Sequence, residues 1–359
     1  MNYIALFMAA FSVLGAADKL IGNRFGLGAE FERGIKMLGV LTLSMLGMIV
    51  ISPTIAWLIE PVTNAMTGAL DPSIITAMLF ANDMGGAPLS VAVGNNAEIA
   101  IFNALVVSSM MGCTLSFTIP FVFESVSENN QHDVILGLLY GIVTIPIGCL
   151  VAGLISDISL PLLLIDLIPL VILSGVVALG LVKAPNLSVK IFKVLGAIIK
   201  LLLTVGLAAG VFELLVGIKI IPKSESIVVG FETILNIACI MTGAFPFLYL
   251  LSKLLSRPLS ALKNKVGINE VSMLGLVSTL ATSVTAFESM DMMDRRGVRL
   301  NAAFSVSAAF VFADHMAFTL SFSEDYILPV ILGKLVAGFS ALVLAFFMTR
   351  EKKDELQKV

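Results

Sequence analysis

Three short stretches carry polar side chains that could bind a solute, and each lies inside an otherwise apolar run. The first, FANDMGGAPLS at 80–90, places Asn82 and Asp83 just before Gly85 and Gly86. The glycines and the following proline disfavour a regular helix, so backbone amide and carbonyl groups are left free. Free backbone groups beside a carboxylate can hold a small polar solute, and we expect these four residues to line a solute site. Capping of the next helix is a compatible alternative role for Asp83.

The second stretch, LVSTLATSVTAFESMDMMD at 276–294, has a polar middle. Helical hydroxyls commonly bond back to carbonyls of their own helix. Four hydroxyls within seven residues are dense for that role, and here they belong to Thr279, Thr282, Ser283 and Thr285. We therefore assign most of these side chains to the solute site, with pairing to Arg295 or Arg296 as the alternative for the glutamate. The assigned residues are Thr282, Ser283, Thr285 and Glu288.

The third stretch, FVFADHMAFTLSF at 310–322, contains Asp314 and His315. A charge at the centre of a bilayer costs about 2.5–3.5 kcal/mol on insertion scales, so its presence indicates function. Neighbouring helical residues point about 100° apart, so one side chain can face a cavity while the other contacts a helix. We expect both in the solute site, and His315 can also carry protons. Ordinary packing is the alternative for the histidine.

Two further charges within apolar segments stay outside this set. Asp166 lies between Pro161 and Pro169. Lys334 lies near the start of the last apolar segment, where its long side chain can snorkel to the membrane surface or pair with an acid.

The composition identifies the elements that must position these residues. Of 359 residues, 58% are hydrophobic and 13% charged, against about 45–50% and 25% in soluble domains. This is the composition of a polytopic membrane protein. The chain shows no basic block for nucleic acid, no phosphate loop and no haem pattern. We therefore expect no cofactor and no consumption of ATP. The three cysteines are spaced as buried thiols, so we expect no metal site.

A membrane-spanning helix needs about 20 apolar residues, and the chain offers eleven such segments. The N-terminus lacks the basic region of a signal peptide, so the first segment is predicted to be a membrane helix. The segments are 3–21, 37–60, 73–92, 98–123, 134–156, 160–182, 194–218, 231–252, 270–290, 299–322 and 326–348.

The two halves of the chain resemble each other at a nearly constant offset of roughly 190–200 residues, which indicates a duplication. Three pairs of strings carry the match: FERGIKMLGVLT with FETILNIACIMT, IFNALVVSS with RLNAAFSVS, and DVILGLLYG with DYILPVILG. We predict a first repeat at 1–156, a linker helix within 157–193, a second repeat at 194–348 and a cytoplasmic tail at 349–359.

Lysine and arginine predict the orientation, because cytoplasmic loops carry the excess of both. If 73–92 and 270–290 enter the membrane and return on the same side, every strongly basic joint faces the cytoplasm. Only Lys219 and Lys223 are misplaced. Each repeat then has four crossing helices and one broken, re-entrant segment, and the linker helix inverts the second repeat. This is a secondary-transporter architecture, with the N-terminus outside and the C-terminus inside.

Several strings resemble the ethanolamine utilization membrane protein family, EutH, over roughly residues 30–345. They are NDMGG, SSMMGCTLSFTIP, GIVTIPIGCLVAGL and MDRRGVRLNAAFSVSAAFVFADHMAFT. The resemblance implies a multi-pass protein of the bacterial cytoplasmic membrane that moves ethanolamine into the cell. It assigns no site residues. Ethanolamine is mostly cationic and bears a hydroxyl, so Asp83 and Asp314 suit its ammonium group.

Other functions remain open at this point. The chain could carry a different small cationic or polar solute, or act as a membrane sensor or scaffold without transport. An intramembrane aspartyl enzyme is the third alternative, but NDMG and ADHM do not match the GxGD pattern of such proteases, and we expect no enzyme. Coupling to H⁺ or Na⁺ is not fixed by the sequence, and assembly as a dimer or trimer rests on analogy with other transporters that have re-entrant hairpins.

Overall fold

The computed structural model describes residues 3–66, 70–80 and 85–349, and all of their side chains except those at 255–265. All regular elements in these ranges are helical. Asn82 and Asp83 lie outside the described residues.

Within the described residues, eight helical stretches are long and apolar enough to cross a membrane by length and composition. The expectation of an all-helical polytopic protein is thereby confirmed, whereas eleven continuous segments are not found in the part of the chain described. The segments expected at 73–92, 270–290 and 299–322 are each interrupted. The eight stretches are Tyr3–Leu20, Leu27–Ala65, Ala97–Ser125, Glu128–Ile155, Leu160–Lys183, Pro185–Val216, Ile227–Leu254 and Glu324–Met348.

The first interrupted segment is a pair of short helices, α4 (Ser73–Leu79) and α5 (Ala87–Val93). Each has seven residues, which is about 10 Å of helix against a hydrocarbon core of about 30 Å. The two helices pack against each other. The Asp71 carboxylate joins their outer ends, because it accepts hydrogen bonds from the backbone amides of Ser73, Asn95 and Asn96 at 2.8–2.9 Å. We call residues 71–96 the first hairpin.

The second interrupted segment has the same construction, with α13 (Glu270–Thr279) and α14 (Ser283–Glu288) packed together. A carboxylate again joins the outer ends. Asp294 accepts hydrogen bonds from the Asn269 amide and the Ser272 hydroxyl, both at 2.8 Å. We call residues 269–294 the second hairpin. In both hairpins the chain returns close to its starting point.

The third interruption lies between α15 (Arg295–Ala308) and α16 (Asp314–Phe322). Phe310 adopts a left-handed backbone with φ of 63°, which is unfavourable for a bulky residue. The break meets the tip of the second hairpin, since the Phe310 and Phe312 amides donate to the Thr279 and Leu280 carbonyls at 3.1 and 3.0 Å. Two interruptions distant in sequence thus satisfy each other's backbone groups.

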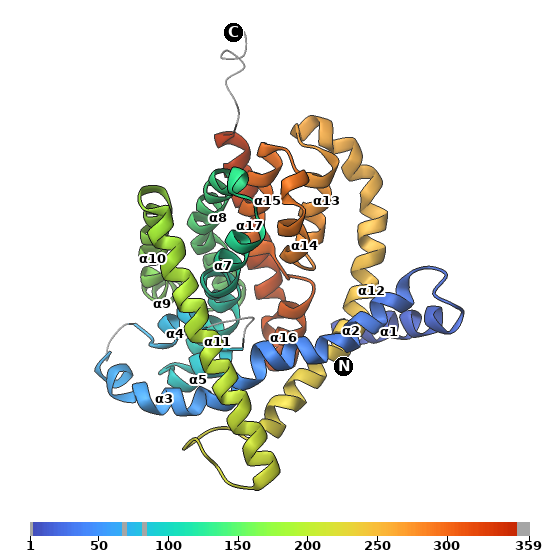
Figure 1. Cartoon of the computed structure of the whole chain (residues 1–359). Coiled ribbons are helices and arrows are strands. Elements are labelled where there is room, and N and C mark those ends of the chain that lie inside the picture. The colour runs from blue at the N-terminus through green and yellow to red at the C-terminus, as the bar shows by residue number, and fades with distance from the viewer. Residues whose placement is uncertain (1–2, 67–69, 81–84, 350–359) are drawn as a thin grey trace.

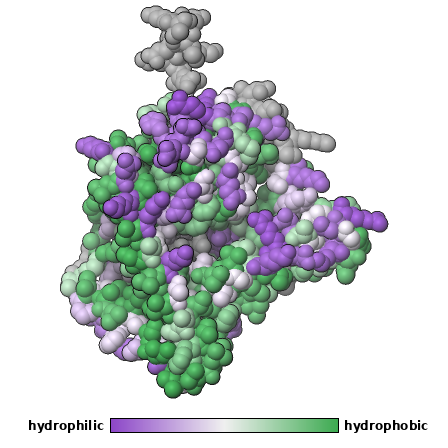
Figure 2. Space-filling model, in the orientation of Figure 1, coloured by the Kyte–Doolittle hydropathy of each residue, from purple (hydrophilic) through white to green (hydrophobic). Residues whose placement is uncertain are grey.

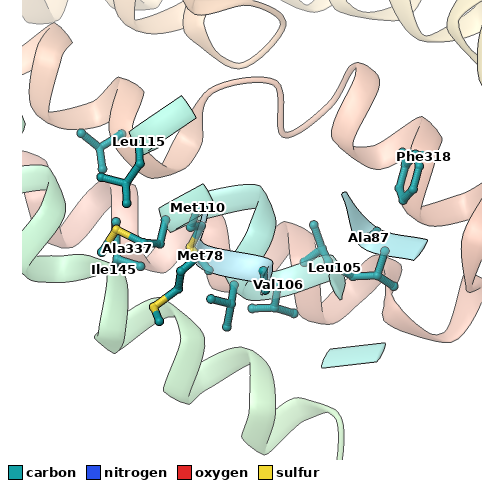
Figure 3. Packing of buried hydrophobic residues seen from close by; sticks show 14 of the residues in the cluster. Met78, Ala87, Leu105, Val106, Met110, Leu115, Ile145, Phe318 and Ala337 are labelled. Carbon is teal, nitrogen blue, oxygen red and sulfur yellow. The ribbon is translucent and has the colours of Figure 1, made fainter. Parts of the chain in front are cut away.

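The segment after the first hairpin contains two π-helices. It consists of α6 (Ala97–Phe102), η2 (Asn103–Gly112), η3 (Thr114–Thr118) and α7 (Ile119–Ser125). Figure 3 shows Met78 and Ala87 of the first hairpin against Leu105, Val106 and Met110 of η2. π-helical turns are rare and concentrate at functional sites, so this buried segment is a second candidate for a functional role.

Close helix packing at glycines holds the centre of the molecule together. The helices α8 (Glu128–Ile155), α15 and α17 (Ile327–Met348) lie side by side (Figure 1). A Cβ on Gly148 of α8 would meet the carbonyl oxygen of Gly333 on α17, and one on Gly141 would meet Val306 of α15. Buried Asp133 of α8 binds Arg295 and Arg299 of α15 through Nε–oxygen contacts of 2.9 and 2.6 Å.

The remaining helices surround this centre. The predicted linker helix is two helices, α9 (Leu160–Asp166) and α10 (Ile168–Lys183). Helix α12 (Ile227–Val266) continues through residues 253–266, where the sequence predicted a joint. In Figure 1, α1 and α2 lie together and extend away from the body. In Figure 2, hydrophobic residues cover much of the visible face, while hydrophilic ones gather near the α1–α2 turn and the end of α17. The bounds are α1 Tyr3–Leu20, α2 Leu27–Leu41, η1 Thr42–Leu46, α3 Gly47–Ala65, α9 Leu160–Asp166, α10 Ile168–Lys183, α11 Pro185–Val216, α12 Ile227–Val266, η4 Met290–Met292 and η5 Glu324–Tyr326.

Candidate functional site

A cavity of about 280 Å³ lies where the tip of the second hairpin meets the break before α16. Asp314, Thr282 and Thr285, all predicted from the sequence, line it together. The opposite wall comes from α2, η1, η3 and α12. The lining residues are Arg33, Met37, Val40, Leu41, Ser44, Phe117, Met241, Phe245, Ala281, Thr282, Val284, Thr285, Phe310, Ala313 and Asp314. We call this space the Asp314 cavity.

Asp314 is placed by the break itself, because it is the first residue of α16. One carboxylate oxygen accepts from the His315 backbone amide at 3.1 Å. The positive end of a helix favours a negatively charged side chain in its first turn, and Asp314 occupies that position in α16. The side chain is half-buried, which leaves it accessible from the cavity.

The two threonines of the cavity lie at the start of α14. The Thr282 hydroxyl accepts from the Val284 amide at 3.3 Å and caps the helix. The hydroxyl of Thr285, which is exposed, is 3.5 Å from the Thr282 carbonyl, a long contact that a ligand can replace at little cost. Both side chains therefore offer hydroxyls to the space beside Asp314.

Three aromatic rings complete the cavity: Phe117, Phe245 and Phe310. The rings of Phe117 and Phe310 contact each other edge-on, with centroids 5.7 Å apart. An aromatic face attracts a cation by roughly 0.5–2 kcal/mol, depending on desolvation. Arg33 already uses the Phe245 ring, with its guanidinium carbon 4.5 Å from the centroid, and it also binds Glu30 at 3.3 Å.

A second cavity of about 300 Å³ adjoins the first. Both are lined by Arg33, Phe245, Ala281, Thr282 and Thr285, and only the second includes Glu30. The pair of cavities therefore forms a continuous lined space along the tip of the second hairpin, with a carboxylate in each part.

The structure places the other predicted residues elsewhere. Ser283 and His315 are buried next to the Asp314 cavity but do not line it; within the described chain, neither the serine hydroxyl nor either imidazole nitrogen has a hydrogen-bond partner. Glu288 is exposed at the end of α14. Gly85 and Gly86 form a buried turn before α5 in the first hairpin.

Sequence reasoning missed two buried polar groups. Lys334 is 1% exposed and donates to the Ser109 carbonyl of η2 at 2.7 Å, so the expectation of snorkelling is wrong. Asp166, also 1% exposed, lies 3.3 Å from the Asn103 amide nitrogen. One signal was present for Asn103, since the repeat match IFNALVVSS with RLNAAFSVS aligns it with another asparagine, Asn301.

Comparison with known proteins adds independent information. A family model described as "Ethanolamine utilisation protein, EutH" matches residues 1–348. A "Probable ethanolamine permease EutH" of Listeria monocytogenes is 39% identical over 359 residues, covering 99% of this chain and 96% of the relative. A protein of the same name in Salmonella typhimurium is 33% identical, with 99% and 96% covered. The uncharacterized protein YxeR of Bacillus subtilis is also 33% identical, with the same coverage. No solved structure matches.

Proposed function

Because the chain belongs to the EutH family of ethanolamine utilisation proteins, we propose that it carries ethanolamine across the bacterial cytoplasmic membrane. One observation in the structure supports this most directly. The Asp314 cavity combines a carboxylate, aromatic rings and hydroxyls in about 280 Å³. Burying a cation without a counter-charge is costly, and Asp314 supplies that charge.

Each part of the ligand has a matching group. The ammonium binds Asp314, with the faces of Phe117 and Phe310 beside it. The hydroxyl reaches Thr282 or Thr285, which can donate or accept a hydrogen bond. The cavity is several times larger than the ligand, so water molecules enter with it, and this suits a carrier that must release its solute.

The wider set of predicted residues belongs to this proposal as well. The sequence assigns Asn82, Asp83, Gly85 and Gly86 to the solute site, and the described Gly85–Gly86 turn of the first hairpin is the proposed counterpart of the second hairpin's tip. Ser283, His315 and Glu288 act near the pocket without lining it in this state. Reorganisation of the tip of the second hairpin during transport would bring them to the solute.

We further propose that units 1–156 and 194–348 are inverted repeats, with a linker at 157–193, a cytoplasmic tail at 349–359, the N-terminus outside and the C-terminus inside. The matching construction of the two hairpins supports the repeat, because a single carboxylate joins the outer ends of the helices in each hairpin, Asp71 in the first and Asp294 in the second. The pairing of Asp133 with Arg295 and Arg299 supports a common side for two of the cytoplasmic joints. A dimer or trimer is the proposed assembly.

The test is uptake of radiolabelled ethanolamine into proteoliposomes that contain the purified protein. Saturable uptake that unlabelled ethanolamine inhibits is the expected result. Uptake equal to that of protein-free vesicles would leave a sensor or scaffold as the better assignment. Uptake of another small amine in preference to ethanolamine would correct the substrate alone.

A further inference from the structure

Asp166, the last residue of α9, sits in a buried polar cluster that the proposed ethanolamine site does not use. Its Oδ1 accepts one hydrogen of the Asn103 amide at 3.3 Å, and the other hydrogen goes to the Ser73 hydroxyl oxygen at 3.0 Å. All three residues are at most 1% exposed. Among the described residues, Asp166 Oδ2 and Asn103 Oδ1 have no hydrogen-bond partner.

Two acceptors without donors are unfavourable in an apolar interior, because each has lost its hydrogen bonds to water. A proton on Asp166 lowers the first of these costs, because a neutral carboxylic acid is less costly to bury than a carboxylate. When a proton forms an O–H bond on Asp166, rotation of the Asn103 amide by 180° turns its oxygen toward Asp166 and Ser73. That oxygen then accepts from both O–H groups, since an amide carries an acceptor on one side and donors on the other.

We propose that Asp166 is a proton-binding site of the carrier, which takes up a proton from one side of the membrane and releases it to the other during transport. The proposal rests on the function proposed above. Asn103 is a positioning residue, because the orientation of its amide depends on the charge of Asp166. A bound proton neutralises the carboxylate, and no other covalent bond changes.

The position of the cluster links this charge to the first hairpin. Ser73 is the first residue of α4, next to the Asp71 carboxylate that closes the first hairpin, and Asn103 is the first residue of π-helical η2. A rotated Asn103 amide therefore changes the contact between the first hairpin and η2. Uptake of a proton by Asp166 is in this way transmitted to the hairpin.

The charged and titratable groups around Asp166 come from three directions. Asp71 at the start of the first hairpin interacts with it electrostatically. Cys149 of α8 interacts electrostatically with both Asp166 and Lys334. Lys334 is buried as well, and its Nζ donates to the Ser109 carbonyl.

A proton fits this site better than a metal cation. Hard metal cations bind six or more oxygen ligands, whereas this cluster brings together side-chain oxygens of three residues, Ser73, Asn103 and Asp166, in either orientation of the amide. Among the described residues, no group of three or more His, Cys, Asp or Glu side chains could hold a metal ion.

The test is radiolabelled ethanolamine uptake into proteoliposomes under imposed pH gradients, after subtraction of protein-free vesicles, through which the neutral amine diffuses. We expect the uptake rate of the wild-type protein to follow the pH gradient and that of Asp166→Asn to ignore it. Asp157→Asn is the matched control, because Asp157 is exposed and its left-handed backbone (φ 59°) suits asparagine. A full pH response in Asp166→Asn would overturn the proposal, as would wild-type uptake driven by a sodium gradient alone.

An infrared measurement on the purified wild-type protein gives a second readout that needs no gradient. The difference between the wild-type and Asp166→Asn spectra should contain a carboxylic-acid C=O band that grows as the pH is lowered and that moves in Asn103→Ala. Absence of that band from the difference spectrum contradicts the proposal. If the band titrates but the protein neither binds nor moves ethanolamine, the proposed function fails while the proton site stands.

Discussion

Replacing Asp314 with asparagine tests the candidate site directly. An ammonium about 4 Å from the carboxylate, at an effective dielectric constant of about 20, gains roughly 4 kcal/mol. Asp314 is half-buried, so water in the cavity screens the pair, and we take about 2 kcal/mol as the lower value. At about 1.4 kcal/mol per tenfold change, Asp314→Asn should weaken ethanolamine binding by about 30- to 700-fold.

The assay is equilibrium binding of ethanolamine to the purified protein at neutral pH, with the melting temperature measured alongside to establish folding. Asp157→Asn is the matched control, because it makes the same substitution at an exposed position outside the cavity. Its affinity should stay within about threefold of wild type. The reasoning fails if Asp314→Asn binds as well as the wild-type protein, or if the two variants lose affinity equally.

Three further predictions concern stability and are checked by thermal unfolding in detergent. Asp133→Asn should lower the free energy of unfolding by about 2–3 kcal/mol, which is less than the roughly 3–5 kcal/mol lost when a buried ion pair is broken, because Arg295 is largely exposed. Glu128→Gln, at an exposed position, should leave the stability almost unchanged. Equal losses in the two variants would contradict the role of the ion pair. Gly148→Ala should lower the melting temperature, since its Cβ meets the Gly333 carbonyl, whereas Gly175→Ala, with nothing within 4 Å, should not; the opposite order would refute the packing argument. Hydrogen bonds from Ser127 and Asn130 hold the pKa of Asp291 below its usual 3.8, so the stabilisation from Asp291 is present above that pH and is lost as the pH falls through the lowered pKa; Asp291→Asn should therefore flatten the acid side of the stability profile, and an unchanged profile would count against the contact.

The composition predicted an all-helical polytopic protein, and glycine, proline or dense hydroxyls predicted two of the interruptions in its helices. The first hairpin follows from Gly85, Gly86 and the proline after them, and the second from the run of hydroxyls. The break before α16 was not predictable in this way, because FVFADHM contains neither glycine nor proline. Tertiary contact explains it, since the carbonyls of Thr279 and Leu280 bind the amides that the break frees.

Only three of the fifteen residues that line the Asp314 cavity were predicted from the sequence, for the same reason. Asp314, Thr282 and Thr285 are polar residues in apolar segments and stand out in the sequence. Arg33 and Phe245, on the opposite wall, do not stand out in the sequence, and only the docking of α2 and α12 brings them to the cavity. Lys334 was misjudged because its partner is a backbone carbonyl, which no residue type reveals.

The ion pair between α8 and α15 has a consequence for how the protein is made. Asp133 and Arg299 are 166 residues apart in the chain. At a synthesis rate of about 5–20 residues per second, the carboxylate leaves the ribosome about 8–33 seconds before its second arginine. For almost all of that interval Asp133 lacks the two arginine side chains that it pairs with in the folded protein. A chain cut short before α15 would keep this carboxylate without either arginine.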